Sequence, residues 1–193
     1  ISSILSALIF YMGVVILGLF LHMGLTYMTL LKMFTSIDIK HFLKSMAPVQ
    51  LLGFSTSSSG ATLPVTMKRC EKDLGISEEI SSFVLPLGAT INMDGTALYQ
   101  GVAAVFIAQA VGMDLTLANQ FTIVATAVLA SIGTAAVPGA GIIMLVIILE
   151  AINVPSEGIA LILGVDRILD MIRTATNVTG DATVASVMDS LER

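Results

Sequence analysis

Residues 45–70 read SMAPVQLLGFSTSSSGATLPVTMKRC, and they decide what kind of fold this chain can have. Two apolar arms, 45–54 and 61–67, flank the polar stretch 55–60. Each arm is too short to cross a bilayer, which takes about 20 apolar residues in a helix. The backbone polar groups of such a tip cannot face lipid, so they must be buried in protein or line a wet cavity. We therefore expect a re-entrant helical hairpin over 45–70.

A second segment with the same organisation covers residues 119–153. Its two apolar arms are again too short to cross, and they meet at a tip that reads SIGTAAVPGAG, residues 131–141. Between the hairpins lies a long apolar segment, 80–111, which is broken by NMDGT at 92–96. Paired interrupted segments of this kind mark a binding site near the bilayer midplane in transporters. We expect an inverted repeat of hairpin and broken span, against the alternative of ordinary helical pairs with Gly-containing turns.

The remaining segments and the composition place the chain in a membrane. Residues 1–31 contain no charged side chain, so 1–33 is expected to be a transmembrane helix and 158–187 a polar one. Within the first span, His22 is expected to pack between helices rather than to relay protons. Of the 193 residues, 55% are hydrophobic and 12% are charged, half of the ~25% charge of a soluble domain. The predicted fold class is an all-α integral membrane protein, and no basic face is available for nucleic acid.

The basic residues predict how these segments are oriented. Six of them flank the first hairpin: Lys32, Lys40, Lys44, Lys68, Arg69 and Lys72. No lysine or arginine occurs between Lys72 and Arg167. Because basic loops stay in the cytoplasm, the base of the first hairpin is expected inside and that of the second outside. The two hairpins then enter from opposite faces, and their tips can meet at mid-membrane as two gates.

The last segment carries five polar residues on one helical stripe, roughly 80° wide at 100° per residue. Its members are Asp166, Asp170, Arg173, Asn177 and Asp181. A charge at bilayer depth costs about 2.5–3.5 kcal/mol on insertion scales, so the stripe must face a cavity or partners. One interpretation is a purely structural ion pair between Asp170 and Arg173. Arg167, beside the stripe, is expected to pair with Asp166.

The second interpretation is a binding site for a small zwitterion. The planar guanidinium of Arg173 matches a carboxylate in two hydrogen bonds, and Asp170 can bind an ammonium group. The amide of Asn177 can serve either end of the ligand because it both donates and accepts. Asp181 has no cation one turn away on its own helix, so a bound metal cation is the economical counter-charge.

The break at 92–96 offers a second set of ligands. Gly95 loosens the helix and frees carbonyl oxygens that suit a small hard cation, and Asp94 adds a full negative charge in mid-span. A carboxylate there needs a proton or a cation, and Na⁺ is favoured because further oxygens are near. The hairpin tips add free N–H groups at 57–60 and free carbonyl groups at 131–134.

Four motifs carry a resemblance to a known family. They read SSSGATLP at 57–64, LPLGATINMDGT at 85–96, ASIGTAAVPGAG at 130–141 and DMIRTATNVTGD at 170–181. In this order they resemble the glutamate transporter family, the dicarboxylate/amino acid:cation symporters. The resemblance implies an elevator-type secondary transporter, in which a mobile transport domain carries substrate and Na⁺ across the membrane. Because neutral amino acid carriers of the family generally lack an arginine at position 173, the resemblance implies Na⁺-coupled symport of L-aspartate or L-glutamate.

The resemblance also implies roles for individual residues. The implied substrate-binding residues are Ser57, Ser59, Thr96, Val137, Gly141, Asp170, Arg173, Thr174 and Asn177. Among them, Thr96, Arg173 and Thr174 would hold the side-chain carboxylate, Asp170 the ammonium group and Asn177 the main-chain carboxylate. The first implied Na⁺ site consists of Gly88, Asn92, Asn177 and Asp181. The second consists of Thr90, Met93, Ser131, Ile132 and Thr134, and the third involves Asn92 and Asp94.

The resemblance runs only over the second half of the family's chain. We therefore expect that the N-terminal scaffold half is absent, and that the full-length protein forms a homotrimer in the cell membrane, the inner membrane if the source is bacterial. Its expected partners are an acidic amino acid, Na⁺ and lipid, without an organic cofactor. The alternatives are a proton-coupled glutamate or dicarboxylate symporter, an ion channel lined by the polar stripe, and a membrane fragment that does not transport. An enzyme is not expected, because the sequence has no Ser/His/acid or Cys/His set.

Overall fold

The computed structural model describes the backbone of residues 2–193 and the burial of side chains from Leu5 onward. Its elements are α1 (Ser2–His22), the π-helical turn η1 (Met23–Tyr27), α2 (Met28–Phe34), α3 (Ile39–Thr56), α4 (Ser59–Lys72), α5 (Glu78–Ile91), α6 (Asp94–Ala110), α7 (Leu117–Ile132), α8 (Ala140–Ala151), the 3₁₀ turn η2 (Ser156–Leu161) and α9 (Leu163–Glu192). No β-strand occurs within residues 2–193, so the all-α class is confirmed.

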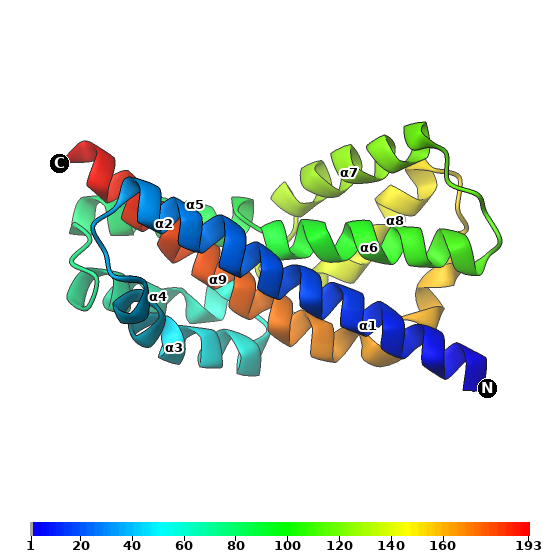
Figure 1. The fold of residues 1–193 in the computed structure, drawn as a ribbon, viewed down its shortest axis with the longest axis horizontal. Coiled ribbons are helices and arrows are strands. Elements are labelled where there is room, and N and C mark those ends of the chain that lie inside the picture. Colours follow the sequence, from blue (N-terminus) through cyan, green and yellow to red (C-terminus); the bar gives the residue numbers. More distant parts are fainter. Residues whose placement is uncertain (1) are drawn as a thin grey trace.

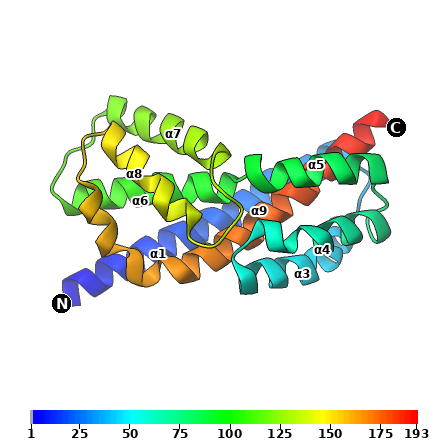
Figure 2. The ribbon, with the colours of Figure 1, turned by 180° about the vertical axis from the view of Figure 1, so that it is seen from behind.

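The helices form an elongated bundle with a hairpin at each end (Figure 1). The α1–η1–α2 helix and α9 run along most of its length, and α5 and α6 lie end to end beside them. The hairpin α3–α4 lies at one end and the hairpin α7–α8 at the other, and Figure 2 shows their loops turned toward the middle of the bundle. The two hairpins therefore point toward each other from opposite ends.

Local backbone chemistry explains why the helices break at the middle. Ser57 ends α3 in the left-handed region, with φ 52°, and Ser58 caps α4 by accepting a hydrogen bond from the Ala61 N–H at 3.1 Å. Gly139, with φ 76°, precedes α8 at a backbone conformation that glycine adopts without strain. The breaks leave the free polar groups of several helix ends near the centre of the bundle.

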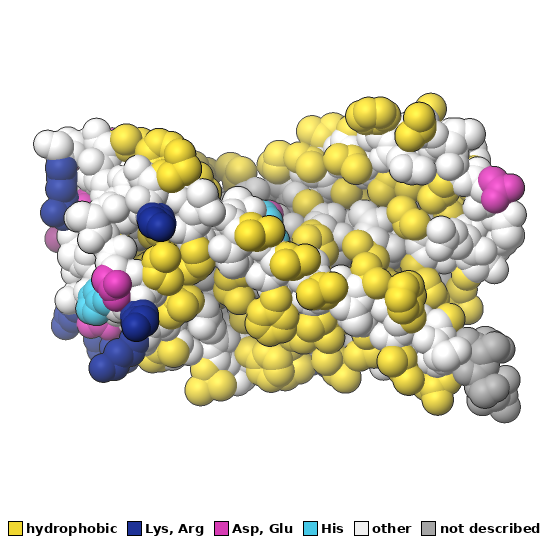
Figure 3. All heavy atoms as spheres, viewed as in Figure 1, with side chains coloured by type: hydrophobic (Ala, Val, Ile, Leu, Met, Phe, Trp, Pro, Cys, Tyr) yellow, Lys and Arg dark blue, Asp and Glu magenta, His cyan; other side chains and the backbone are white. Residues whose placement is uncertain are grey.

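The surface agrees with a membrane setting. Within the described residues, one helix, Leu5–Phe34, is long and apolar enough to span a membrane by length and composition. Large apolar side chains are exposed along α1 and α7, among them Phe10, Leu117 and Phe121, and they cover much of the face in Figure 3. On the same face, lysine and arginine gather at the end that α2–α5 and the C-terminus form. The charge separation along the sequence is thus also a separation in space.

Two apolar cores hold α9 in place. One core joins α1, α6, α7, α8 and the first part of α9, through buried residues such as Leu19, Ile107 and Leu145. The other joins α2–α5 and the second part of α9, through residues such as Phe42 and Leu85. Because α9 belongs to both cores, the polar stretch between its two apolar parts is fixed at the centre of the bundle.

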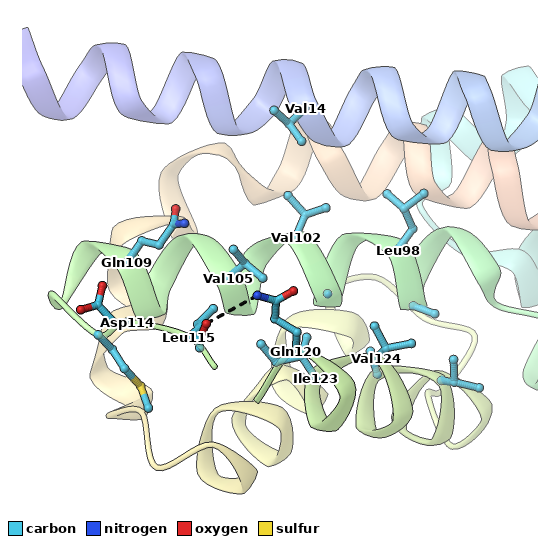
Figure 4. Close-up of a pocket in the computed structure, with 15 residues that line it drawn as sticks. Val14, Leu98, Val102, Val105, Gln109, Asp114, Leu115, Gln120, Ile123 and Val124 are labelled. Atoms are coloured by element: carbon cyan, nitrogen blue, oxygen red, sulfur yellow. Dashed lines mark hydrogen bonds between the residues drawn. The ribbon is translucent and has the colours of Figure 1, made fainter. Parts of the chain in front are cut away.

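An open apolar groove of about 830 Å³ runs between α1, α6 and α7 (Figure 4). Its walls are mostly aliphatic, with Gln109, Asp114 and Gln120 as polar exceptions. The Gln120 side chain donates to the Leu115 carbonyl oxygen at 3.5 Å. None of the residues that the sequence assigns to substrate or ions lines this groove, so it is separate from the predicted site.

The end of α9 is held to the start of α5 by Asp189, which gives a test of stability. Its carboxylate accepts a hydrogen bond from the Ser77 N–H at 2.8 Å and pairs with Arg193 at 2.8 Å. Burial opposes ionisation of Asp189, but the bonds from Ser77 and the charge of Arg193 outweigh it and hold its pKa below the ordinary value. We expect Asp189→Ala to lower the free energy of unfolding by about 1 kcal/mol at pH 7.

The pH dependence of this effect has a definite sign. Because the folded pKa of Asp189 is lowered, its contribution is present above the unfolded pKa of about 4 and is lost as the pH falls through the folded value. Unfolding in detergent should be measured for the wild type and Asp189→Ala between pH 7 and pH 3. The difference between their free energies of unfolding should disappear at low pH. Glu192→Ala, at an exposed position of the same helix end, is the control. A difference between the wild type and Asp189→Ala that stays constant with pH would contradict the assignment.

Candidate functional site

The residues that the sequence assigns to substrate converge on one small cavity, the substrate cavity. It lies where tip 1 (residues 55–60) and tip 2 (residues 131–141) meet α6 and α9, and its volume is about 20 Å³. All nine assigned residues line it: Ser57, Ser59, Thr96, Val137, Gly141, Asp170, Arg173, Thr174 and Asn177. A space of this size holds about one water molecule, so the two tips must separate before a larger ligand can enter.

Arg173 is the charged centre of the site. Its side chain is almost fully buried, and its guanidinium donates to the Asp170 carboxylate at 2.6 Å and to Asp166 at 3.4 Å. The guanidinium carbon also lies 3.8 Å from the centroid of the Tyr99 ring, a cation–π contact. Two carboxylates and an aromatic face thus compensate one buried cation, as burial of a charge requires.

The expected pair between Asp166 and Arg167 is wrong. Asp166 is buried and contacts Arg173, seven residues further along α9. Residues seven apart lie about 20° from each other on a helix, whereas adjacent residues lie about 100° apart. Arg167 is instead exposed, and no ion pair of the described residues includes it.

Asn177 connects α9 to the first turn of α6. Its Nδ2 donates to Thr96 Oγ1 at 3.1 Å, and its Oδ1 accepts from the Gly95 N–H at 2.9 Å. A Cβ on Gly95 would lie 2.8 Å from this oxygen, which explains why the motif has a glycine there. The Asn177 amide is therefore oriented from both sides at the edge of the substrate cavity.

Tip 2 is held closed by three hydrogen bonds. The Ser58 hydroxyl donates to the Ala136 carbonyl oxygen at 2.6 Å, and the Gly60 N–H reaches the same oxygen at 3.3 Å. The Gly139 N–H donates to Asp170 at 3.0 Å. Tip 1 and α9 thus both bind tip 2, and Asp170 contacts Arg173 and the tip at once.

Two buried polar side chains, one in the cavity wall and one behind it, have distinct roles. The Ser57 hydroxyl is buried and has no hydrogen-bond partner among the described residues, so it is available to a ligand. Gln100, fully buried on α6, donates from Nε2 to the Gly141 carbonyl oxygen at 2.9 Å and thereby fixes the start of α8. Sequence reasoning missed Ser58, Tyr99 and Gln100; the only available signal was that Ser58 precedes α4 as a favourable N-cap residue.

Three of the four residues assigned to the first Na⁺ site line a second cavity of about 150 Å³: Gly88, Asn92 and Asp181. The Asn92 amide donates to Asp181 Oδ1 at 3.0 Å. Asp181 is 3% exposed, and no basic side chain among the described residues forms an ion pair with it. Its charge is therefore uncompensated by the protein, which points to a cation or a proton. Asn177, the fourth residue, lies one turn earlier on α9, at the substrate cavity.

The residues assigned to the second Na⁺ site are only partly together. Met93 and Thr134 both line the substrate cavity, whereas Thr90 and Ile132 are exposed. The Ser131 hydroxyl donates to a carbonyl oxygen of its own helix, that of Val128, at 2.8 Å. The second site stays a prediction.

Asp94, assigned to the third Na⁺ site, is held by the π-helical turn. Tyr27 donates its hydroxyl hydrogen to Asp94 Oδ2 at 3.0 Å, and His22 Nε2 lies 3.0 Å from the same oxygen. The extra residue of a π-turn allows His22 and Tyr27, five positions apart, to contact one carboxylate. His22 thus packs against α6, and Tyr27 is a partner that the sequence did not indicate.

Charged groups buried between two opposed helix breaks are typical of the binding sites of membrane transport proteins. The sequence profile of the sodium:dicarboxylate symporter family matches residues 2–191, and the chain belongs to this family. The resemblance seen in the four motifs is thereby confirmed, and the family consists of transporters rather than enzymes.

Sequence identity to individual transporters supports the same assignment. The chain is 44% identical to excitatory amino acid transporter 4 of Mus musculus over 95% of its length, which is 33% of the relative. It is 43% identical to excitatory amino acid transporter 1 of Rattus norvegicus, with 95% and 34% of the two chains covered. Excitatory amino acid transporter 3 of Mus musculus is 45% identical, with 95% and 35% covered. The chain spans about a third of the length of these relatives.

Proposed function

We propose that the protein to which this chain belongs is a Na⁺-coupled symporter of acidic amino acids, L-aspartate or L-glutamate. The observation that carries the proposal is Arg173, buried at a cavity between two hairpin tips and paired with a carboxylate on the same helix. The names of the relatives, excitatory amino acid transporters, support the same substrate class.

The substrate would replace the internal ion pair. The side-chain carboxylate of the amino acid takes the guanidinium fork of Arg173, and its ammonium group takes Asp170. Asp170 then releases the Gly139 N–H, which it accepts at 3.0 Å when tip 2 is closed. Arg173 and Asp170 would then each keep an opposite charge beside them, because the ligand supplies one charge of either sign to the separated pair.

The main-chain carboxylate would lie between Asn177 and tip 1. The positive end of the α4 dipole lies there, its Gly60 N–H would be released from Ala136 when tip 2 opens, and the unpartnered Ser57 hydroxyl adds a donor. Val137 and Gly141 of tip 2 would close over the ligand. Asp170 would distinguish an amino acid from a plain dicarboxylate, because a dicarboxylate has no ammonium group to bind to it.

Na⁺ would supply the positive charge that Asp181 lacks. The 150 Å³ cavity at Gly88, Asn92 and Asp181 offers carbonyl, amide and carboxylate oxygens, the ligands that a hard cation prefers. The ion would order the junction of α5 and α6, which also carries Thr96 at the substrate cavity. Through this junction, ion binding and substrate binding would favour each other, which is coupling in the thermodynamic sense.

The transport cycle would involve both hairpins and the bundle as a whole. The two hairpins would be re-entrant and serve as gates on opposite faces, the bundle would move as an elevator-type transport domain, and the full-length protein would be a homotrimer in the cell membrane. The animal relatives give no support to a bacterial inner membrane.

The Arg173–Asp170 pair argues against a cation channel, because a cation pathway with a buried arginine at its centre repels its own ion.

The test is a calorimetric titration of the full-length protein with L-aspartate and L-glutamate. In NaCl we expect binding, and with choline chloride in its place a loss of affinity of at least about 100-fold. Succinate, which lacks the ammonium group, and L-asparagine, which lacks the second carboxylate, are matched control ligands and should bind at least about tenfold more weakly. Equal binding with and without Na⁺ would replace the proposal by the proton-coupled alternative, and binding of neither amino acid would overturn it.

A further inference from the structure

Arg167 is a charged residue for which the site described above has no use. It lies on α9, its side chain is exposed, and no hydrogen bond or ion pair of the described residues involves it. An unpaired guanidinium facing hydrocarbon costs about 2.5–3.5 kcal/mol on insertion scales. In the membrane, this side chain therefore needs water, an anion or an acidic group of the rest of the protein beside it.

Its position places it beside the mouth of the substrate cavity. Arg167 precedes Asp170 by three residues, so the two side chains leave α9 about 60° apart and about 4.5 Å apart along the axis. Asp170 contacts Gly139 of tip 2, and Figure 2 shows the α7–α8 loop beside the middle of α9. On this geometry, Arg167 leaves α9 within about 60° of the face that Asp170 turns toward tip 2.

The charges at this end of the bundle are otherwise negative. Between Lys72 and Arg173, Arg167 is the only basic residue of the sequence. The exposed charged side chains of the loops at this end are acidic: Asp114, Glu150 and Glu157. Figure 3 shows acidic atoms there and no basic ones on the visible face. An anion that approaches from this end is repelled by every exposed charge except Arg167.

We propose that Arg167 is a positioning residue that attracts the anionic substrate to the mouth at tip 2 and raises its association rate constant. The inference rests on the proposed function, because it requires a substrate of net negative charge. Arg167 does not line the closed cavity, so it acts before tip 2 closes and leaves the bound state unchanged. Attraction by fixed charges raises association rates and weakens as ionic strength rises.

The experiment is stopped-flow binding of L-aspartate to the full-length protein at constant Na⁺, with ionic strength varied by choline chloride. At the lowest ionic strength, Arg167→Gln is expected to lower the association rate constant about three- to tenfold, and Arg167→Glu to lower it further. Arg167→Lys should preserve the rate constant, and the dissociation rate constant should stay the same in all variants. The difference from wild type should vanish as salt is added. Lys72→Gln, which removes an exposed charge at the opposite end, is the matched control.

The outcomes separate this inference from the proposed function. If the wild type binds aspartate but Arg167→Gln associates at the wild-type rate, the role of Arg167 is wrong and the transporter proposal stands. A loss that is independent of salt, or one that appears in the dissociation rate constant, also overturns it, because it indicates direct contact or altered folding. If the wild type itself binds no aspartate, both proposals fail together.

Discussion

Arg173→Lys is expected to weaken the binding of L-aspartate and L-glutamate about 100-fold, which corresponds to about 2.7 kcal/mol. Lysine keeps the positive charge but loses the planar fork that matches a carboxylate with two parallel hydrogen bonds. It also loses the stacking on the Tyr99 ring, 3.8 Å from the guanidinium carbon, which sets the plane of that fork. A point charge at the same place cannot hold both carboxylate oxygens, so affinity should fall although the net charge of the site is unchanged.

Lysine is the informative replacement, because alanine would lower the stability of the fold as well as the affinity for substrate. Removing the cation would leave Asp166 and Asp170 buried beside each other without a partner, and breaking a buried pair in this way costs about 3–5 kcal/mol. Arg173→Lys retains a partner for both carboxylates. Its thermal unfolding in detergent should therefore stay close to that of the wild type.

The measurement is calorimetric titration of the full-length protein in saturating Na⁺. Arg69→Lys is the matched control, because it makes the same chemical change at a partly buried ion pair with Asp73, away from the substrate cavity at one end of the bundle. This control should bind aspartate as the wild type does. Binding by Arg173→Lys within about threefold of wild type, with a normal melting curve, would contradict the assignment of Arg173 to the substrate carboxylate.

The sequence predicted the site largely through the cost of burying polar groups. Asp170, Arg173 and Asn177 stand out because a charge or an amide in an apolar segment is expensive unless it has a purpose. For the same reason the polar stretches at tip 1 and tip 2 could be recognised as breaks. The resemblance to the family added the other six residues assigned to substrate, and all nine line one cavity.

The residues that the sequence missed were not identified by this cost. Tyr27 and Tyr99 look like ordinary residues of apolar helices, and Gln100, although an amide in an apolar segment, shows nothing of its partner along the sequence. Their contacts with Asp94, Arg173 and Gly141 depend on how distant helices pack. The wrong pairing of Arg167 has a different cause: Asp166 and Arg167 are adjacent along the chain, but adjacent side chains leave a helix about 100° apart. The small size of the cavity could not be predicted either, because it follows from three tertiary hydrogen bonds between tip 2 and its neighbours.

Asp181→Asn is expected to abolish the dependence of aspartate binding on Na⁺ and to raise the dissociation constant in saturating Na⁺ at least about 100-fold. Asp181 is buried, its carboxylate accepts a hydrogen bond from the Asn92 amide, and no basic side chain of the described residues pairs with it. An asparagine has nearly the same shape and still accepts from Asn92, so the fold should survive. What it lacks is the negative charge that would hold a cation at the 150 Å³ cavity.

The same substitution separates a bound ion from a bound proton. If Asp181 is neutralised by a proton, asparagine imitates the protonated acid, and aspartate binding should persist at wild-type strength without Na⁺. If Na⁺ is the counter-charge, asparagine removes its ligand, and titration of aspartate at increasing Na⁺ should give a flat, weak affinity. Asp189→Asn, on the same helix but bonded to Ser77 and Arg193, is the control and should keep the full Na⁺ dependence. The two outcomes differ in direction as well as in size, because only the proton alternative allows strong binding to survive the loss of the charge.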